Sequence, residues 1–290
     1  MKTCGFTIIR NAVKYDYPVV EAIRSVLPVC DEFLVLIGNS EDTTLDLIKS
    51  IGSPKIRIEE SIWDDSLKEG GKVLAVETNK AMDLIGDEFD WAFYIQADEV
   101  IHEKYHPAIL EGMNKWAGNK EVEGLLFKYT HFYGTYNYIG DSRRWYRNEI
   151  RIVKNDKSIR SYRDAQGFRK NDQKLRVKAI DAYVYHYGYV KNPRTMLTKV
   201  LDFHKLWHDE EWIRKNFNME ELFDFSEIDS LGLFQGTHPA VMDERINNSS
   251  WDIKIDINQK RFTTKEKILY RIEKLTGLRL FEYKNYSILK

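Results

Sequence analysis

The stretch Trp91-Ala92-Phe93-Tyr94-Ile95-Gln96-Ala97-Asp98-Glu99-Val100 joins an apolar run to an acidic turn. Five apolar or aromatic residues in succession predict a strand that is covered on both faces, as in a parallel sheet. The polar residues that follow come at the carboxyl end of that strand, where open α/β sheets bind ligands. Carboxylates there can hold a hard divalent cation, with phosphate oxygens completing its shell. A strand that simply ends in a charged turn is the alternative interpretation.

Strands and helical patterns alternate along the first half of the chain. Apolar runs predict further strands at residues 6–10, 33–37, 56–58, 124–129, 150–153 and 182–187, and helices are predicted at residues 18–28, 43–51 and 72–85. Alternation with short connections is typical of an α/β fold in which helices cover both faces of a parallel sheet. The loops after Ile9, Ile37 and Ile95 all carry polar residues, so we expect them to converge on one site.

The composition is that of a globular protein with balanced charge. The chain has 290 residues, 43% of them hydrophobic, with 44 basic and 45 acidic side chains. This balance excludes the strongly basic composition of a nucleic-acid coat, and we expect no nucleic-acid partner. No apolar run approaches the roughly 18–20 residues that span a bilayer, and the start is too short for a secretory signal. Two cysteines cannot build a disulfide framework, so we expect a cytoplasmic protein.

The second part of the chain changes character near Asn192-Pro193. We expect a catalytic domain over residues 1–192 and a mainly helical region over residues 193–290. From Arg261 onward there are eight basic residues and three acidic ones, and residues 265–275 have the spacing of an amphipathic helix. Such a helix can rest on an anionic membrane surface, or it can pack on the catalytic domain with a solvated basic face.

Four short motifs, in this order, resemble glycosyltransferase family 2, whose members have the GT-A fold. Asn11 follows the first strand, and Ser40-Glu41-Asp42-Thr43-Thr44 matches the family's Ser-x-Asp-x-Thr loop after the second. Thr78-Asn79 stands where the family has an Arg-Asn or similar pair, and Gln96-Ala97-Asp98 stands at its Asp-x-Asp motif. The resemblance covers about the first 190 residues. It implies a mixed, mostly parallel sheet with helices on both faces, followed by a helical region.

Two positions depart from the family pattern. The family often ends its second strand with an acidic residue that reads the nucleobase, where this chain has Gly38-Asn39. The first acid of the Asp-x-Asp motif is Gln96 here, which can bond ribose hydroxyls but carries no charge. The identity of the base and the strength of metal binding therefore stay open.

The resemblance also implies a set of site residues. A nucleotide-sugar donor would be bound by Arg10, Asn11, Asn39, Ser40, Asp42, Asn79, Gln96 and Asp98. Mg²⁺ or Mn²⁺ would be held by Asp98, with Glu99 second, and by His186 near the end of a late strand. The metal would stabilise the departing diphosphate as a Lewis acid. The alternative for His186 is a histidine bonded within a tyrosine-rich core.

An inverting transfer needs a base that takes the proton of the acceptor hydroxyl. Asp164, in a polar loop where resembling enzymes carry their base, is the candidate, and Asp141 and Glu149 are weaker alternatives. The aromatic segment 127–146 offers flat faces for sugar rings, and we expect Tyr136, Arg144 and Trp145 to bind the acceptor. Aromatic residues in strands are also common in protein cores.

These observations predict a metal-dependent, inverting glycosyltransferase. It would move a sugar from a nucleoside diphosphate to a hydroxyl of a glycan or lipid-linked saccharide, as in polysaccharide biosynthesis. A nucleotidyltransferase would need a glycine-rich loop after the first strand, and residues 6–17 contain no glycine. A non-catalytic protein that binds nucleotide or carbohydrate is the other alternative, since Gln96 replaces an acid.

Overall fold

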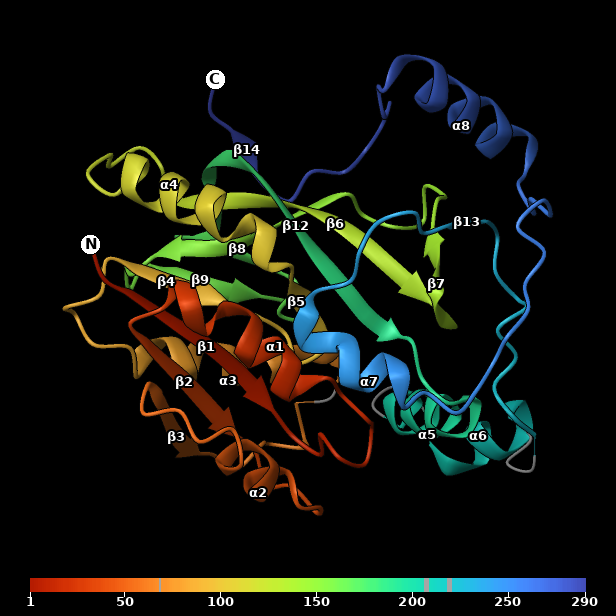
Figure 1. Ribbon diagram of the computed structural model, residues 1–290, viewed down its shortest axis with the longest axis horizontal. Helices are drawn as coiled ribbons and strands as arrows, with labels where there is room; N and C mark the ends of the chain where they lie inside the picture. Colours follow the sequence, from red (N-terminus) through yellow and green to blue (C-terminus); the bar gives the residue numbers. More distant parts are fainter. Residues whose placement is uncertain (68, 206–208, 218–220) are drawn as a thin grey trace.

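A curled central sheet organises the computed structural model, which describes residues 1–67, 69–205, 209–217 and 221–290 (Figure 1). The strands are β1 (Thr3–Ile9), β2 (Glu32–Ile37), β3 (Ile56–Glu60), β4 (Trp91–Tyr94), β5 (Glu99–Ile101), β6 (Gly124–Tyr133), β7 (Thr135–Gly140), β8 (Asn148–Lys154), β9 (Ile159–Tyr162), β10 (Gly167–Lys170), β11 (Gln173–Lys174), β12 (Arg176–Tyr189), β13 (Leu231–Leu233) and β14 (Ser287–Ile288). The α-helices are α1 (Val19–Val26), α2 (Thr44–Lys49), α3 (Lys72–Asp83), α4 (His106–Trp116), α5 (Pro193–His204), α6 (Glu210–Asn216), α7 (Asp243–Asn247) and α8 (Thr264–Thr276). Short 3-10 helices are η1 (Leu27–Val29), η2 (Glu69–Gly71), η3 (Glu103–Tyr105) and η4 (Ala240–Met242).

The sheet is mixed, as expected, with a parallel half built by the N-terminal strands. Its main path runs β13-β7-β6-β8-β4-β1-β2-β3, and β12 pairs with β6, β5 and β14. Strands β4, β1, β2 and β3 are all parallel, whereas β8 is antiparallel to both β4 and β6. Because β12 is parallel to β6, it runs in the same direction as β4. The carboxyl ends of β1, β4 and β12 therefore lie at the same edge.

Helices cover both faces of the parallel half, which confirms the α/β fold predicted from the apolar runs. Side chains alternate along β2: Phe33, Val35 and Ile37 pack with α1, α2 and α4 on one face. Leu34 and Leu36 pack with α3 on the other. The predicted run at 33–37 is apolar throughout because each face of this strand is buried.

The region from residue 193 onward contains helices, and it also contributes strands to the sheet. Helices α5 to α8 lie there, while β13 pairs with β7 and β14 pairs with β12. These pairings tie the end of the chain to the sheet of the first 192 residues. No helix in the described ranges has the length and apolar character needed to cross a bilayer.

A buried ion pair fixes the turn that follows β4. Arg151, on β8, donates from Nε to Oε2 of Glu99 at 2.8 Å and from Nη2 to Oε1 at 2.7 Å, and both side chains are fully buried. The Tyr129 hydroxyl and the Gln96 backbone N–H also donate to this carboxylate, at 2.8 and 3.0 Å. Arg151 Nη1 further donates to the Gln166 carbonyl at 2.9 Å. One guanidinium thus connects the turn after β4 to the loop after β9.

Replacing Arg151 with methionine is expected to destabilise the fold by about 3–5 kcal/mol, because Glu99 would be left charged and unpaired in the interior. Urea unfolding measures the effect. The matched control is Arg160→Met, which breaks a pair with Asp83 whose side chains are 40% and 54% exposed. That change should cost about 1 kcal/mol or less. Equal losses in the two variants would contradict the structural role given to Arg151.

Candidate active site

A cavity of about 870 Å³ opens at the sheet edge where β1, β4 and β12 end. Arg10 and Asn11 line it from the end of β1, Gln96 and Asp98 from the turn after β4, and His186 from β12. Helix α5 adds Lys199, and the loop after β9 adds Asp164 and Gln166. The cavity therefore lies at the edge that the polar loops predicted.

Asp98 has two nitrogen neighbours in this cavity. Its Oδ1 lies 3.7 Å from His186 Nε2, and its Oδ2 accepts a hydrogen bond from Lys199 Nζ at 3.5 Å. The Lys199 ammonium also donates to the Gly188 carbonyl at 3.1 Å. A Cβ at Gly188 would lie 2.7 Å from Asp98 Oδ2, so glycine permits the close approach of β12 to this carboxylate.

Hydrogen bonds assign the protonation of His186. His131 Nε2 lies 2.8 Å from the Tyr146 carbonyl, which only accepts, so this nitrogen carries the proton. Burial lowers the pKa of His131 to about 3, so the ring is neutral and its Nδ1 is an acceptor. His186 Nδ1, 3.2 Å away, must then be the donor. His186 Nε2 consequently presents a lone pair beside the Asp98 carboxylate.

Electrostatics keep Asp98 charged at neutral pH. Burial acts against its charged form, but neighbouring cations, the Lys199 ammonium among them, outweigh it and hold the pKa of Asp98 below its usual value. Burial lowers the pKa of His186 and so favours the neutral imidazole. For Lys199 burial opposes the charge, yet the neighbouring Tyr17 and Asp98 raise its pKa. The wall thus combines a carboxylate, a neutral imidazole and an ammonium.

The donor atoms fit a cation that takes most of its ligands from a substrate. No group of three or more His, Cys, Asp or Glu side chains suited to a metal is found in the described ranges. Asp98 and His186 nevertheless offer one oxygen and one unprotonated nitrogen with no proton between them. Mg²⁺ commonly binds through one or two carboxylates plus phosphate oxygens, and Mn²⁺ accepts similar ligands.

Glu99 does not join Asp98 on the cavity wall. Its carboxylate accepts two bonds from Arg151 and one from Tyr129, inside the protein. A bound metal would have to displace the arginine, so we assign Glu99 a structural position in place of the expected ligand role. The acidic turn therefore offers a single carboxylate, Asp98, to the cavity.

Arg10 and Asn11 line the cavity. The other predicted donor-binding residues in this region belong to the loop after β2, and their hydrogen bonds fix the conformation of that loop. Asn11 has a left-handed φ of 57°, accepts from the Glu41 N–H at 2.8 Å and donates its own N–H to Ser40 Oγ at 3.0 Å. Asn39 Oδ1 accepts from the Trp63 N–H at 3.2 Å, and Asp42 accepts from the Lys14 N–H at 2.7 Å. Asn39, Ser40 and Asp42 do not line the cavity.

The loop that carries Asp164 is positioned from two sides. Asn79, on α3, accepts from the Ser161 N–H at 2.8 Å, and Gln96 Nε2 donates to the Ala165 carbonyl at 3.3 Å. Arg163 and Ala165 have left-handed φ values of 57° and 60°, so the backbone turns tightly on either side of Asp164. Asp164 itself is exposed and lines the cavity. Asn79 and Gln96 thus act on the Asp164 loop.

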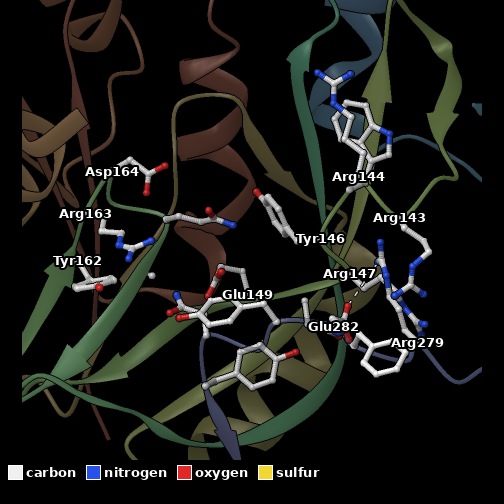
Figure 2. Close-up of a pocket in the computed structure, with 18 residues that line it drawn as sticks. Arg143, Arg144, Tyr146, Arg147, Glu149, Tyr162, Arg163, Asp164, Arg279 and Glu282 are labelled. Atoms are coloured by element: carbon white, nitrogen blue, oxygen red, sulfur yellow. Dashed lines mark ion pairs between the residues drawn. The ribbon is translucent and has the colours of Figure 1, made fainter. Parts of the chain in front are cut away.

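A second pocket, of about 340 Å³, adjoins the cavity and shares Arg144, Trp145, Tyr146, Asp164 and Gln166 with it. Figure 2 shows Asp164, Arg163 and Tyr162 on one side of this pocket and Arg143, Arg147, Arg279 and Glu282 on the other. Tyr146 and Glu149 lie between the two groups. The pocket is therefore rich in arginine and aromatic side chains, as suits a polar ligand with flat apolar faces.

Among the other residues considered from sequence, Tyr136 and Asp141 lie away from both pockets. Tyr136 is buried against Tyr187 and Trp251 in a separate core cluster. The Asp141 carboxylate accepts from the Tyr270 hydroxyl at 2.8 Å and pairs with Lys260 at 3.2 Å. We therefore retain Arg144 and Trp145, but not Tyr136, as candidate acceptor residues.

Glu149 lines the second pocket but is almost completely buried. Burial raises its pKa to about 7. The side chain is therefore partly protonated near neutral pH, which makes it the remaining alternative to Asp164 as a base.

Comparison with known proteins gives distant structural likenesses. No protein-family model and no curated protein matches the chain. S. aureus TarS 1–349 in complex with UDP aligns with a TM-score of 0.42 and 13% identity, over 73% of this chain and 68% of TarS 1–349. Glucosyl-3-phosphoglycerate synthase from Mycobacterium tuberculosis, in complex with Mn²⁺, UDP and phosphoglyceric acid, aligns with a TM-score of 0.30 and 15% identity, over 45% and 43%. Because these TM-scores and sequence identities are low, we infer the function from the pocket residues alone.

Three residues that contact or position the side chains of the cavity were not predicted from the sequence. Lys199 lies 101 positions after Asp98, and its helix had no feature that linked it to the sheet edge. His131 and Arg151 occur in strands, where neither has a distinctive neighbouring motif. The only available signal was a charged or ionisable residue inside an otherwise apolar run, as in Ile150-Arg151-Ile152.

Glu149→Gln is expected to change how stability depends on pH. The folded-state pKa is about 7 against 4.5 for the ordinary side chain. Ionisation therefore opposes folding, and the wild type loses stability as pH rises through this window. Glutamine cannot ionise, so the variant should gain about 2 kcal/mol on the wild type between pH 5 and pH 8.

Urea unfolding at both pH values measures this difference. Glu121→Gln, at an exposed position, is the matched control and should show the same stability difference from wild type at both pH values. A Glu149→Gln variant that also tracks the wild type at both pH values would refute the raised pKa.

Proposed function

We propose that this protein is an inverting glycosyltransferase that uses a nucleoside diphosphate sugar as donor. One observation carries the proposal: Asp98, the His186 Nε2 lone pair and the Lys199 ammonium face the same cavity that Asp164 lines. Asp98, His186 and Lys199 together suit the binding of a diphosphate with its cation. Asp164 suits a base for the incoming hydroxyl, because it is exposed in the cavity.

The donor diphosphate would lie beside Asp98, His186 and Lys199. Asp98 and His186 would hold Mg²⁺ or Mn²⁺, which when bound supplies Lewis-acid stabilisation of the leaving diphosphate. Lys199 adds a positive charge from α5 that does not depend on a metal, and its bonds to Asp98 and Gly188 fix its position. Arg10, held at 2.8 Å by Asp65, adds a second cation to the donor side.

Transfer requires the acceptor oxygen to attack the anomeric carbon on the face opposite the leaving group. Asp164 takes the proton of the acceptor hydroxyl while the bond from the anomeric carbon to the diphosphate oxygen breaks. The electron pair of that bond leaves with the diphosphate, where Lys199 stabilises the charge. The transition state has oxocarbenium character, by analogy with glycoside hydrolysis.

The acceptor would enter through the arginine-rich second pocket. Asp164 and Gln166 lie on the boundary of the two pockets, so a hydroxyl bound there can meet the donor sugar. Tyr146 and Tyr162 offer aromatic surfaces for a sugar ring, and Arg144 offers hydrogen bonds to its oxygens. A glycan or a lipid-linked saccharide has both a ring that can pack on these aromatic surfaces and oxygens that can accept hydrogen bonds from Arg144.

Asp98→Asn should weaken binding of a nucleoside diphosphate in the presence of Mn²⁺ by at least about tenfold, because the cavity would lose its charged ligand. Calorimetric titration with UDP, GDP, CDP and dTDP, each with and without Mn²⁺, measures the effect. Asp181→Asn, at a side chain on β12 that is 83% exposed and outside both pockets, is the matched control. A Mn²⁺-dependent affinity that survives in Asp98→Asn would remove Asp98 from the donor site.

Asp164→Asn should lower the rate of sugar transfer by about 10²–10⁴-fold and leave nucleotide binding unchanged, since the amide cannot accept the proton. Release of nucleoside diphosphate measures turnover. Asp172→Asn, on the next exposed turn and outside both pockets, should behave as the wild type.

If Asp164→Asn keeps full turnover and Glu149→Gln loses it, Glu149 is the base. A wild-type protein that binds nucleotide but transfers no sugar to any tested acceptor would instead favour a non-catalytic binding protein.

A further inference from the structure

Helix α8 is well formed but has no buried residue. Thr263 and Glu266 form a capping box at its start, and Gly277, with a φ of 71°, ends it. Figure 1 shows the helix standing apart from the central sheet. The helix therefore keeps its conformation through its own caps and a few polar contacts, and leaves most of its surface free.

The side of α8 that contacts the rest of the protein is polar. Glu273 pairs with Arg143 at 2.8 Å and with Arg147 at 3.3 Å. One turn earlier, the Tyr270 hydroxyl donates to Asp141 at 2.8 Å. A surface helix of a globular protein normally turns its apolar stripe inward and its charges outward. In α8 the charged side chain Glu273 faces inward.

The apolar stripe of α8 faces solvent. Ile268, Ile272 and Leu275 are spaced four and three residues apart, so they share one face of the helix. Ile268 is 55% exposed and Leu275 is 86% exposed, and Ile272 between them is half-buried. The turn that follows exposes two more large apolar side chains, Leu278 at 62% and Phe281 at 90%. Several large apolar side chains thus lie uncovered in one short segment.

Cations border this stripe. Lys265, Lys267, Arg271 and Lys274 are all exposed on α8. The two acidic residues of the helix lie on its other side, because Glu273 faces the arginines of the β7–β8 connection and Glu266 precedes it by two helical turns. The outer surface therefore combines apolar side chains with a positive border.

We propose that α8 and the following turn to Phe281 bind the surface of an anionic lipid bilayer. An apolar face bordered by lysine and arginine is what an interfacial helix requires, because the apolar side chains enter the acyl boundary and the cations meet lipid phosphates. A second copy of the chain fits less well. A symmetric dimer through this face would set its cations against the same cations of the partner.

Binding of a bilayer by this surface does not require the proposed chemistry, but the surface shares Phe281 with the second pocket. Phe281 and Tyr283, which follow α8, line that pocket together with Asp164. Bilayer contact and acceptor binding would consequently use neighbouring residues of one segment. A saccharide carried by a membrane lipid would reach the pocket without leaving the surface.

The test is cosedimentation of the full chain with vesicles of phosphatidylcholine alone and with about 30% phosphatidylglycerol. The wild type should bind the anionic vesicles, release them as salt is raised, and bind neutral vesicles much less. Lys267→Gln and Arg271→Gln should each weaken binding about fivefold. The pair Ile268→Ser and Leu275→Ser should weaken it further, while Ile62→Ser, at a position 79% exposed on another surface, should not.

Thermal unfolding checks that the variants fold, as expected for exposed positions. Absence of binding to anionic vesicles would overturn the proposal, and so would binding that Ile268→Ser and Leu275→Ser leave intact. Sedimentation velocity provides the remaining arm: a dimer of the wild type that these two substitutions dissociate would assign the face to a second copy. Vesicle binding and sugar transfer are separate measurements, so failure of one does not imply failure of the other.

Discussion

The buried contact between Arg151 and Glu99 is the constraint on which the cavity depends. Both side chains are fully buried, and charges removed from water are stable only when they are paired and hydrogen-bonded. The pair satisfies this condition through two bonds between its members and further donors from Tyr129 and Gln96. Arg151 also donates a hydrogen bond to the Gln166 carbonyl. The two loops that line the proposed donor and acceptor sites are thereby held by one side chain.

This constraint also decides how the acidic turn is used. Because Glu99 is committed to the interior, Asp98 alone is presented to the cavity, where it meets His186 and Lys199. His131 completes the arrangement by accepting a hydrogen bond from His186 Nδ1–H. The Nε2 atom of His186 therefore keeps its lone pair toward the carboxylate. A site built in this way has few protein ligands of its own. In the proposed function, the oxygens of a bound diphosphate and the Lys199 ammonium supply the rest.

The sequence predicted the fold well because a buried strand or helix has a recognisable run or spacing of apolar residues. The apolar run at 33–37 lies in β2, the helical spacing at 72–85 corresponds to α3, and the strand at 91–95 corresponds to β4. The position of the cavity also followed from sequence, since polar residues after parallel strands share one edge. The partners of those residues could not be predicted in the same way. Glu99 and Asp98 are adjacent in sequence and chemically alike, and only the neighbouring strand β8 determines which one is buried.

The central claim is that Asp98, His186 and Lys199 receive a diphosphate while Arg151 keeps Glu99 in the interior. A crystal structure of the protein with a nucleoside diphosphate and Mn²⁺ tests it most directly. We expect the ion and the diphosphate to lie against these three side chains, with both Glu99 oxygens still bonded to Arg151. A nucleotide bound elsewhere, or a metal ligated by Glu99 after release from Arg151, would contradict the account.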